Sequence, residues 1–201
     1  MGVIKTALEI ALEKTGSVKS DKSCIDQFDA KQKGKKIAGA FMAGETDLNR
    51  EIKEIPDAQK DSFKQGVFDV LISQISLPAV NSDNKEDEKR VETAGKGLSI
   101  VVNNKQFGRF FQELTQVFSR FTQETAHYDQ AIKQQYAPKL RQKEEELTRR
   151  FGREVHIDPF QDPEFVSFYN QHMTALKSNY ENAVTQVKEE IRRIFIESLA
   201  A

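Results

Sequence analysis

Apolar residues recur at alternating steps of four and three through residues 107–151, and this spacing predicts one long amphipathic helix. The stripe is made by Phe107, Phe111, Leu114, Phe118, Phe121, Thr125, Tyr128 and Ile132. A second long helix is predicted over residues 163–199, because Asp162-Pro163-Glu164 is a typical helix start. Its stripe is made by Tyr169, Met173, Leu176, Tyr180, Ala183 and Val187, and it widens to Ile191, Ile194, Phe195 and Leu199.

The two predicted helices fit each other as an antiparallel hairpin. Each stripe is wide at one end and narrow at the other, as expected for bundle packing and for a coiled-coil seam respectively. Counting outward from the turn places Ile194 near Phe121 and Met173 near Leu140 or Arg141. The wide part of one stripe then faces the wide part of the other, and the narrow parts face each other. Pro138 lies inside the first arm, where it predicts a kink or a break in the helix.

The first half of the chain is predicted to form shorter helices between turn signals. They are expected over residues 3–14, from Ser20 to about Met42, from Asp47 to Ile55, from Asp57 or Asp61 to about Ile75, and over 86–102. Gly44 is a candidate helix end, and residues 79–88 predict the main loop. A strand over residues 98–102 stays open as an alternative, because the run is β-branched and two glycines precede it.

The apolar side chains of these shorter helices give the expected core of the N-terminal part. They are Ile25, Phe28, Ile37, Phe41, Phe63, Val67, Phe68, Val70, Leu71 and Ile75. The polar stretch Lys31–Lys36, which carries Gly34, is expected to be solvated. We therefore expect an all-α protein with an N-terminal helical bundle over residues 1–102. Residues 103–201 would form the long antiparallel, coiled-coil-like hairpin, which shares its base with the bundle.

The net charge and the cysteine content limit which partners and which cellular compartment we expect for the protein. The formal net charge of −1 gives the chain no general attraction to nucleic acid or to an anionic membrane. Cys24 is the single cysteine, so an internal disulfide is impossible, as is usual in a reducing compartment. The sequence has no run of 18 apolar residues and no secretory pattern. We therefore expect a cytoplasmic protein with neither nucleic-acid nor membrane partners.

The sequence contains no recognisable catalytic, cofactor or metal motif. The histidines at positions 127, 156 and 172 show no zinc-ligand spacing with one another or with the cysteine. Gly39 and Gly44 have the spacing of a phosphate loop, but Glu45 and Thr46 follow where Lys and Ser or Thr are required. We predict that the protein is not an enzyme and uses no cofactor.

The connection between the long helices, residues 152–162, is more apolar than a plain turn. Val155, Ile157 and Phe160 either fold back onto the hairpin arms or form a partner-binding tip. Because these side chains are the most distinctive feature of the predicted turn, they are our candidate partner-binding residues.

Two segments near this connection resemble a known group of proteins. Ala137-Pro-Lys-Leu-Arg-Gln-Lys-Glu-Glu-Glu-Leu and Ile157-Asp-Pro-Phe-Gln-Asp-Pro-Glu-Phe are similar to parts of an uncharacterised bacterial helical family of unknown function. The resemblance covers residues 137–195 at most. It implies a helical protein and assigns no catalytic residue.

The expected shape favours a non-catalytic interaction protein, namely an adaptor, a stalk-like subunit or a regulatory scaffold with an unknown protein partner. A long two-helix arm has little interior for a catalytic pocket but presents a long surface. A homodimer is a further hypothesis, with a shared seam of Tyr128, Tyr136, Tyr169 and Tyr180. The alternative is a ligand-binding or enzymatic module with a pocket around Phe41, Phe63, Phe68 and Phe107.

Overall fold

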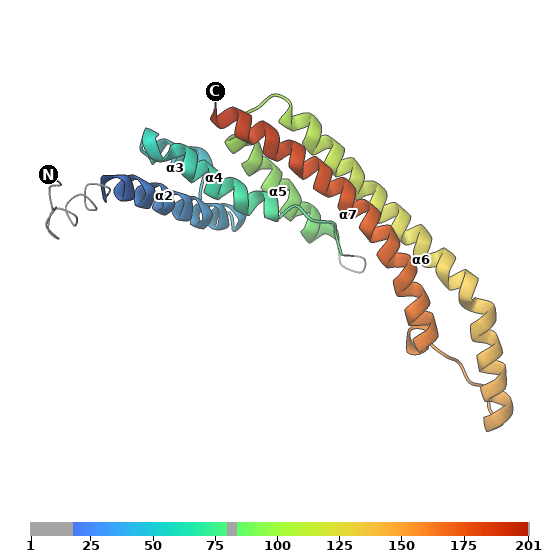
Figure 1. Cartoon of the computed structure of the whole chain (residues 1–201). Coiled ribbons are helices and arrows are strands. Elements are labelled where there is room, and N and C mark those ends of the chain that lie inside the picture. Colours follow the sequence, from blue (N-terminus) through green and yellow to red (C-terminus); the bar gives the residue numbers. More distant parts are fainter. Residues whose placement is uncertain (1–17, 80–83, 201) are drawn as a thin grey trace, which may run out of the picture. The chain divides into compact units, whose positions relative to one another are not determined.

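The computed structural model describes residues 18–79 and 84–200, and every regular element in them is helical (Figure 1). The elements are α2 (Val18–Met42), α3 (Leu48–Glu54), α4 (Asp57–Ser73), α5 (Asn84–Val102), α6 (Phe107–Phe151), the short 3-10 helix η1 (Pro159–Gln161) and α7 (Pro163–Leu199). The predicted all-α class is confirmed. The alternative of a strand over residues 98–102 is wrong, because α5 includes them, and the helix predicted over residues 3–14 lies outside the described residues.

Contacts group the described residues into two compact units. The first contains the described residues up to Ile75, Lys89–Phe107 and those from Arg193 onward. The second contains Ser76–Glu88 and Gly108–Arg192, and so holds most of α6 and α7. The predicted domain boundary after residue 102 stays a prediction.

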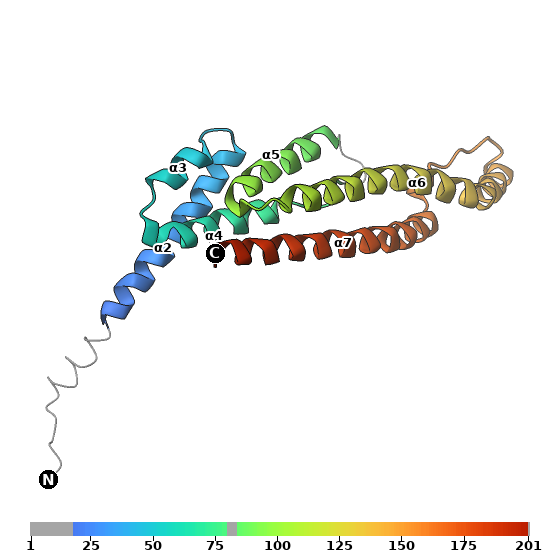
Figure 2. The same ribbon diagram turned by 90° about the horizontal axis from the view of Figure 1, so that it is seen from above.

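In the first unit, α2 and α4 pack against each other, crossing in the view of Figure 2, and their backbones approach closely at a pair of glycines. A Cβ atom on Gly34 would overlap the backbone oxygen of Phe63, and a Cβ atom on Gly66 would overlap the backbone oxygen of Lys31. Only glycine at both positions allows the two backbones to come this close. The ion pair between Lys31 and Asp69, with 2.9 Å between Nζ and Oδ2, links the same two helices.

The buried face of α2 therefore differs from the predicted one. Ala30, Gly34 and Ala38 are buried at steps of four residues, whereas Ile25 and Phe28 are exposed. The expectation that Ile25 and Phe28 point inward was wrong, as was the expectation that Gly34 lies in a solvated stretch. The physical reason is that close backbone approach selects small side chains for the contact face.

The remaining helices of the first unit complete its core around α4. Asp47 caps α3 by accepting a hydrogen bond from the backbone N–H of Asn49 at 2.8 Å, as predicted. Gly44 ends α2 with φ of +78°, which glycine adopts without strain. Gly97 of α5 is closely packed, because a Cβ atom there would lie 2.6 Å from a methyl carbon of Leu71 and 2.8 Å from the ring of Phe41.

Aromatic rings fill the interior of the first unit. Phe63 is fully buried, and Phe68 stacks on Phe195 with 4.1 Å between ring centroids. Phe107 is buried as well. A ligand pocket among these phenylalanines, the alternative function, stays a prediction.

In the second unit, α6 and α7 lie side by side as an antiparallel hairpin in both ribbon views (Figures 1 and 2). The predicted bounds of both long helices agree with the structure, and α6 continues through Pro138 without a break. The buried side chains of the seam are Leu114, Phe121, Thr125, Ile132 and Tyr136 from α6 and Phe165, Tyr169, Met173, Leu176, Val184 and Ile191 from α7. Tyr128, predicted to lie in the stripe, is exposed.

The register of the hairpin differs from the predicted one. Phe121 contacts Tyr180, with ring centroids 5.3 Å apart, and the hydroxyl of Tyr169 donates to Asp129 at 3.0 Å. Ile194, predicted to lie beside Phe121, is fourteen residues beyond Tyr180, which corresponds to about 21 Å along a helix. The prediction was wrong because it counted both arms from the middle of the connection, whereas the connection itself runs back along α6.

Candidate functional site

The last turns of α6 extend past the start of α7, and the connection folds back onto them (Figure 1). The backbone N–H of Val155 donates to Oγ1 of Thr148 at 3.1 Å, and that of Ile157 donates to Oε1 of Glu144 at 2.9 Å. These bonds attach an irregular segment to a helix and satisfy backbone groups that would otherwise need water. The end of the hairpin is therefore an ordered surface that combines the last turns of a helix with an irregular segment bonded to them.

A polar cluster around Asp162 fixes the point where α7 begins. Asp162 is buried and caps α7 by accepting a hydrogen bond from the backbone N–H of Glu164 at 3.1 Å. Nζ of Lys143 donates to both carboxylate oxygens of Asp162, at 2.9 and 2.7 Å, and the hydroxyl of Tyr136 donates to Oδ2 at 3.0 Å. Glu164 accepts from Lys143 at 2.8 Å and pairs with Lys139 at 2.9 Å. The start of α7 is thus tied to three positions on α6.

The charges of this cluster stabilise one another. Hydrogen bonds from Lys139 and Lys143 lower the pKa of Glu164 from 4.5 to about 2. The hydrogen bonds from Lys143 likewise lower the pKa of Asp162 and outweigh the opposing effect of its burial. The same two carboxylates raise the pKa of Lys143 well above its ordinary value. All three groups are therefore charged at neutral pH.

The structure divides the three predicted partner-binding residues between two faces. Ile157 is half-buried and lines a shallow hollow of about 390 Å³ together with Leu147, Arg150 and Pro163. Val155 is half-buried nearby, with its backbone bonded to α6. Both side chains partly fold back onto the arm, as the first of the two alternatives predicted. Partner binding by these residues stays a prediction.

Phe160 lies elsewhere, against the hydrophobic seam. Its ring meets the rings of Phe165 and Tyr169 edge to face, with centroids 5.3 Å apart in both pairs. Nζ of Lys133 lies 5.5 Å from the centroid of the Phe160 ring. Phe160, which is 48% exposed, lines a different hollow from the one that Ile157 lines.

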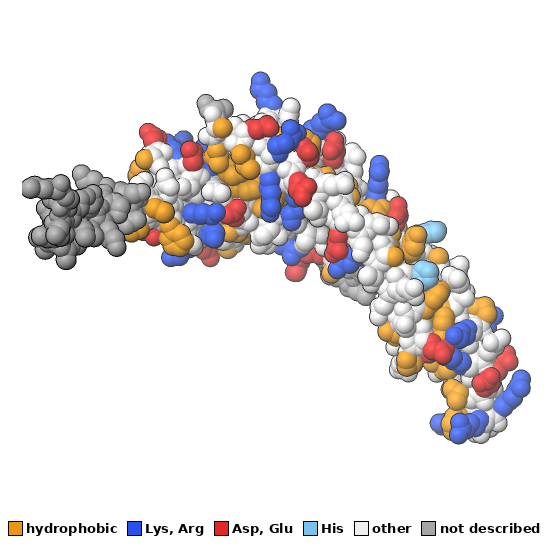
Figure 3. Space-filling model, in the orientation of Figure 1, with side chains coloured by type: hydrophobic (Ala, Val, Ile, Leu, Met, Phe, Trp, Pro, Cys, Tyr) orange, Lys and Arg blue, Asp and Glu red, His pale blue; other side chains and the backbone are white. Residues whose placement is uncertain are grey.

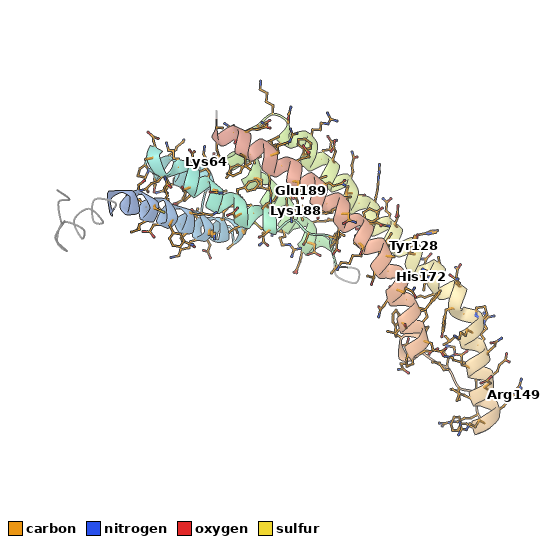
Figure 4. The ribbon with its side chains drawn as sticks, viewed as in Figure 1. Lys64, Tyr128, Arg149, His172, Lys188 and Glu189 are labelled. Carbon is orange, nitrogen blue, oxygen red and sulfur yellow. The ribbon has the colours of Figure 1, made fainter. Side chains whose placement is uncertain are left out.

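A different aromatic residue dominates the end of the hairpin. Phe151, on the last turn of α6, is 60% exposed, and the guanidinium of Arg150 lies 5.9 Å from its ring centroid. Arg149 projects from the same turns (Figure 4), and apolar and basic side chains gather at this end (Figure 3). We call this region the tip surface. It consists of Leu147, Arg150, Phe151, Arg153, Val155 and Ile157.

The other chemical candidates do not converge on a reaction centre. Within the described residues, no group of three or more His, Cys, Asp or Glu side chains is placed to hold a metal ion. His156 is exposed beside Glu144, with 3.1 Å between Nδ1 and Oε1, and His172 on α7 contacts Phe168 instead. Among the described helices, none is both long enough and apolar enough to cross a membrane.

Three of the four tyrosines proposed for a dimer seam pack against other residues of the same chain. Tyr136 and Tyr169 are buried between α6 and α7, and Tyr180 packs against Phe121. A second copy would have to open the hairpin to reach the first two. The homodimer itself stays a prediction.

Several residues of this region were not singled out from the sequence. Lys143 received no role in the sequence analysis, and Phe165 was left out of the seam, although Phe165 precedes Tyr169 by one helical turn. Phe151 was placed in the apolar stripe of α6, whereas it is exposed. The spacing of Phe165 contained the missing signal, but nothing local in the sequence pairs Lys143 with Asp162, nineteen residues away.

Comparison with known proteins identifies a family for the chain and leaves its function open. No curated protein and no solved structure gives a significant match to the chain. A family of unknown function, DUF6657, matches residues 49–193, a range that reaches well before the segments that suggested an uncharacterised family. The bacterial origin implied by the resemblance stays a prediction. Because the matched range covers more than half of the sequence, the chain belongs to this family of unknown function, DUF6657.

Proposed function

We propose that the protein is a non-catalytic helical interaction protein that binds a partner protein through its tip surface. The observation that supports this most strongly is Phe151, a large aromatic side chain with 60% of its surface exposed at the end of α6. Aromatic and arginine side chains supply most of the binding energy in protein interfaces. Both kinds of side chain are present here, because the guanidinium of Arg150 lies beside the ring of Phe151.

The charges around Phe151 indicate the chemistry of the partner. Arg150 and Arg153 form no ion pair among the residues that the structure describes, and Arg149 reaches Glu145 only at 3.9 Å. A guanidinium without a carboxylate partner is available to bind one. We therefore propose a partner segment that places an apolar side chain against Phe151 and carboxylates against these arginines.

The structure of the connection supports tight binding by this surface. Its backbone is held by Thr148 and Glu144, and its C-terminal end is fixed by the buried Asp162. A surface that is already ordered loses little conformational entropy when a partner binds. Such a preformed end suits an adaptor, a stalk-like subunit and a regulatory scaffold alike.

The proposal is tested by affinity capture of the full-length chain from a lysate of its host, followed by quantitative mass spectrometry. The tip variant carries Phe151→Ser and Ile157→Ser. The matched control is Phe28→Ser on α2, since Phe28 is also 60% exposed. We expect one protein to be retained by the wild type and by the control, and to be lost with the tip variant.

A second measurement examines the proposed chemistry with the purified partner. Arg150→Glu with Arg153→Glu should weaken binding more than tenfold by titration calorimetry, with the larger effect at low salt because salt screens exposed charges. If the tip variant and the control retain the same proteins, the tip surface is not the binding site. If reversing the two charges leaves the affinity unchanged, the acidic partner segment is wrong.

Cytoplasmic localisation and self-association remain part of the proposal. The single cysteine, Cys24, is exposed in the structure and would stay reduced in the cytoplasm. Light scattering of the purified chain gives its mass directly, and the mass of a monomer at micromolar concentration would reject the homodimer.

A further inference from the structure

A cavity of about 340 Å³ lies along α6 in the second unit, away from the tip surface. It is lined by residues of α6, by Tyr169 on α7, by Phe160 in the connection, and by Pro78 and Ala79. Small-molecule sites in proteins begin at about this volume. We call it the side cavity.

One hydroxyl in the side cavity has no hydrogen-bond partner within the described part of the chain. Thr125 is only 6% exposed, and its Oγ1 is buried and unpaired. The neighbouring Thr122 lines the same cavity but donates to the backbone oxygen of Phe118 at 3.1 Å. Buried polar groups are nearly always paired, because burial without a partner is destabilising. Thr125 lines the side cavity, but its Oγ1 is turned away from that space. A threonine in a helix has two common χ1 rotamers, and a ligand atom would pair with Oγ1 after the side chain rotates toward the cavity.

A cation lies farther along the same face of α6. Asp129 and Lys133 follow Thr125 at steps of four residues, so all three side chains line the cavity. Asp129 is fully engaged, because Oδ1 accepts from the hydroxyl of Tyr169 at 3.0 Å and Oδ2 accepts from Nζ of Lys133 at 2.8 Å. The ammonium of Lys133 has three donors, so after this bond it still has N–H groups for a ligand.

The remaining walls are aromatic. The rings of Phe121, Phe160 and Tyr169 line the side cavity, and Phe160 is the most exposed of them. Flat aromatic ligands pack well against such rings. A cavity of about 150 Å³ holds benzene, so this volume suits roughly two fused rings.

We propose that the side cavity binds a small aromatic acid, whose hydrogen-bonding group meets Thr125 and whose carboxylate meets Lys133. Thr125 and Lys133 are eight residue steps apart, which corresponds to about 12 Å along the helix axis. The long side chain of Lys133 can shorten this distance, so a two-ring acid with polar groups at opposite ends fits. The site goes beyond the proposed partner binding and uses none of the residues of the tip surface.

Titration calorimetry of the full chain with 6-hydroxy-2-naphthoate tests the proposal. Two further acids are compared with it: naphthoate, which lacks the hydroxyl, and hydroxyphenylacetate, which has a single ring. Thr125→Val should lower the affinity for the hydroxynaphthoate by three- to tenfold, as expected for the loss of about one hydrogen bond. It should also raise the melting temperature, because it removes an unpaired buried hydroxyl. The rise in melting temperature shows that the variant folds and separates lost binding from lost structure.

Two further variants test the orientation of the ligand. Lys133→Gln should weaken binding of the carboxylate about tenfold, while binding of the neutral hydroxynaphthamide should stay unchanged. Thr115→Val is the matched control, since Thr115 is exposed on the same helix and donates to the backbone oxygen of Phe111 at 2.8 Å. This control should bind the hydroxynaphthoate as the wild type does.

Absence of saturable binding with all three acids at millimolar concentration would overturn the proposal. Equal affinities of the wild type, Thr125→Val and Lys133→Gln would overturn it as well, because the ligand would then be elsewhere. The tip variant Phe151→Ser with Ile157→Ser should bind the hydroxynaphthoate normally. The failure of the side cavity and the failure of the partner proposal are therefore distinguishable.

Discussion

Replacing Gly34 by alanine should destabilise the protein, although the same change at an ordinary helix position is stabilising. A Cβ atom at position 34 would overlap the backbone oxygen of Phe63 and lie 3.1 Å from the backbone nitrogen of Val67. Ordinary van der Waals contacts of a Cβ atom lie at 3.4–4 Å. Because the opposing atoms belong to the backbone of α4, no side-chain rotation can relieve the overlap.

The size of the effect follows from separating the two helices. Making room for the methyl group moves α2 and α4 apart by about 1 Å, and such a gap removes a quarter to a half of the dispersion attraction along the contact. We estimate a cost of about 3–5 kcal/mol from overpacking and lost contacts. Alanine recovers about 1 kcal/mol through its higher helix propensity. The net loss of unfolding free energy is therefore about 2–4 kcal/mol.

Gly39 provides the matched control, because it lies in the same helix and a Cβ atom there would have no neighbour within 4 Å. Gly39→Ala should raise the unfolding free energy by about 0.5–1 kcal/mol. Urea denaturation followed by far-UV circular dichroism measures both variants. If Gly34→Ala is as stable as Gly39→Ala, the close approach of α2 and α4 at this position is wrong.

Further predictions concern the aromatic core of the first unit and the polar cluster around Asp162. Phe195→Ala should cost about 3–5 kcal/mol of unfolding free energy, whereas Ile196→Ala, next to it and 64% exposed, should change it by less than about 0.5 kcal/mol, as measured by urea denaturation. Asp162→Ala should lower the unfolding free energy by about 2–3 kcal/mol, because it removes a cap and leaves buried donors unpaired, while Asp158→Ala on η1 should cost about 1 kcal/mol. The carboxyl pKa of Glu164 is lowered to about 2, so its contribution to stability is complete above its ordinary pKa of 4.5 and is lost as the pH falls toward 2. Melting temperatures of the wild type and Glu164→Gln should therefore differ at pH 6 and converge near about pH 2; a constant difference would contradict this assignment.

The bounds of the long helices were predictable because local signals define them. The apolar period extends to Phe151, and Asp162 with Pro163 marks the next start, as the structure confirms. The register between α6 and α7 was not predictable in the same way, because it depends on the path that the connection takes. Residues 152–162 run back along α6, held by Thr148 and Glu144, and such backbone-to-side-chain bonds leave no periodic trace in the sequence.

The buried face of α2 shows a second limit. Hydrophobicity favoured Ile25 and Phe28, but the structure buries Ala30, Gly34 and Ala38. A contact made by small residues has a weak hydrophobic signal, and its spacing becomes informative only when the opposing glycine, Gly66, is known to face it. Burial of Thr125 was predicted from its place in the stripe of α6, but its unpaired hydroxyl depends on the three-dimensional surroundings.

The cluster around Asp162 links the two proposed sites, and this link can be tested. The bonds from Lys143 and Tyr136 to Asp162 fix where α7 begins, so the last turns of α6 extend beyond that point and contribute to the tip surface. The same bonds hold the connection in the position in which Phe160 lines the side cavity. Asp162→Ala should therefore weaken both partner capture and binding of the hydroxynaphthoate in a protein that remains helical by circular dichroism. The Phe151 variant should affect capture alone, and the Thr125 variant should affect ligand binding alone. If Asp162→Ala leaves both activities intact while lowering stability, the cluster only supports the fold and does not position either site.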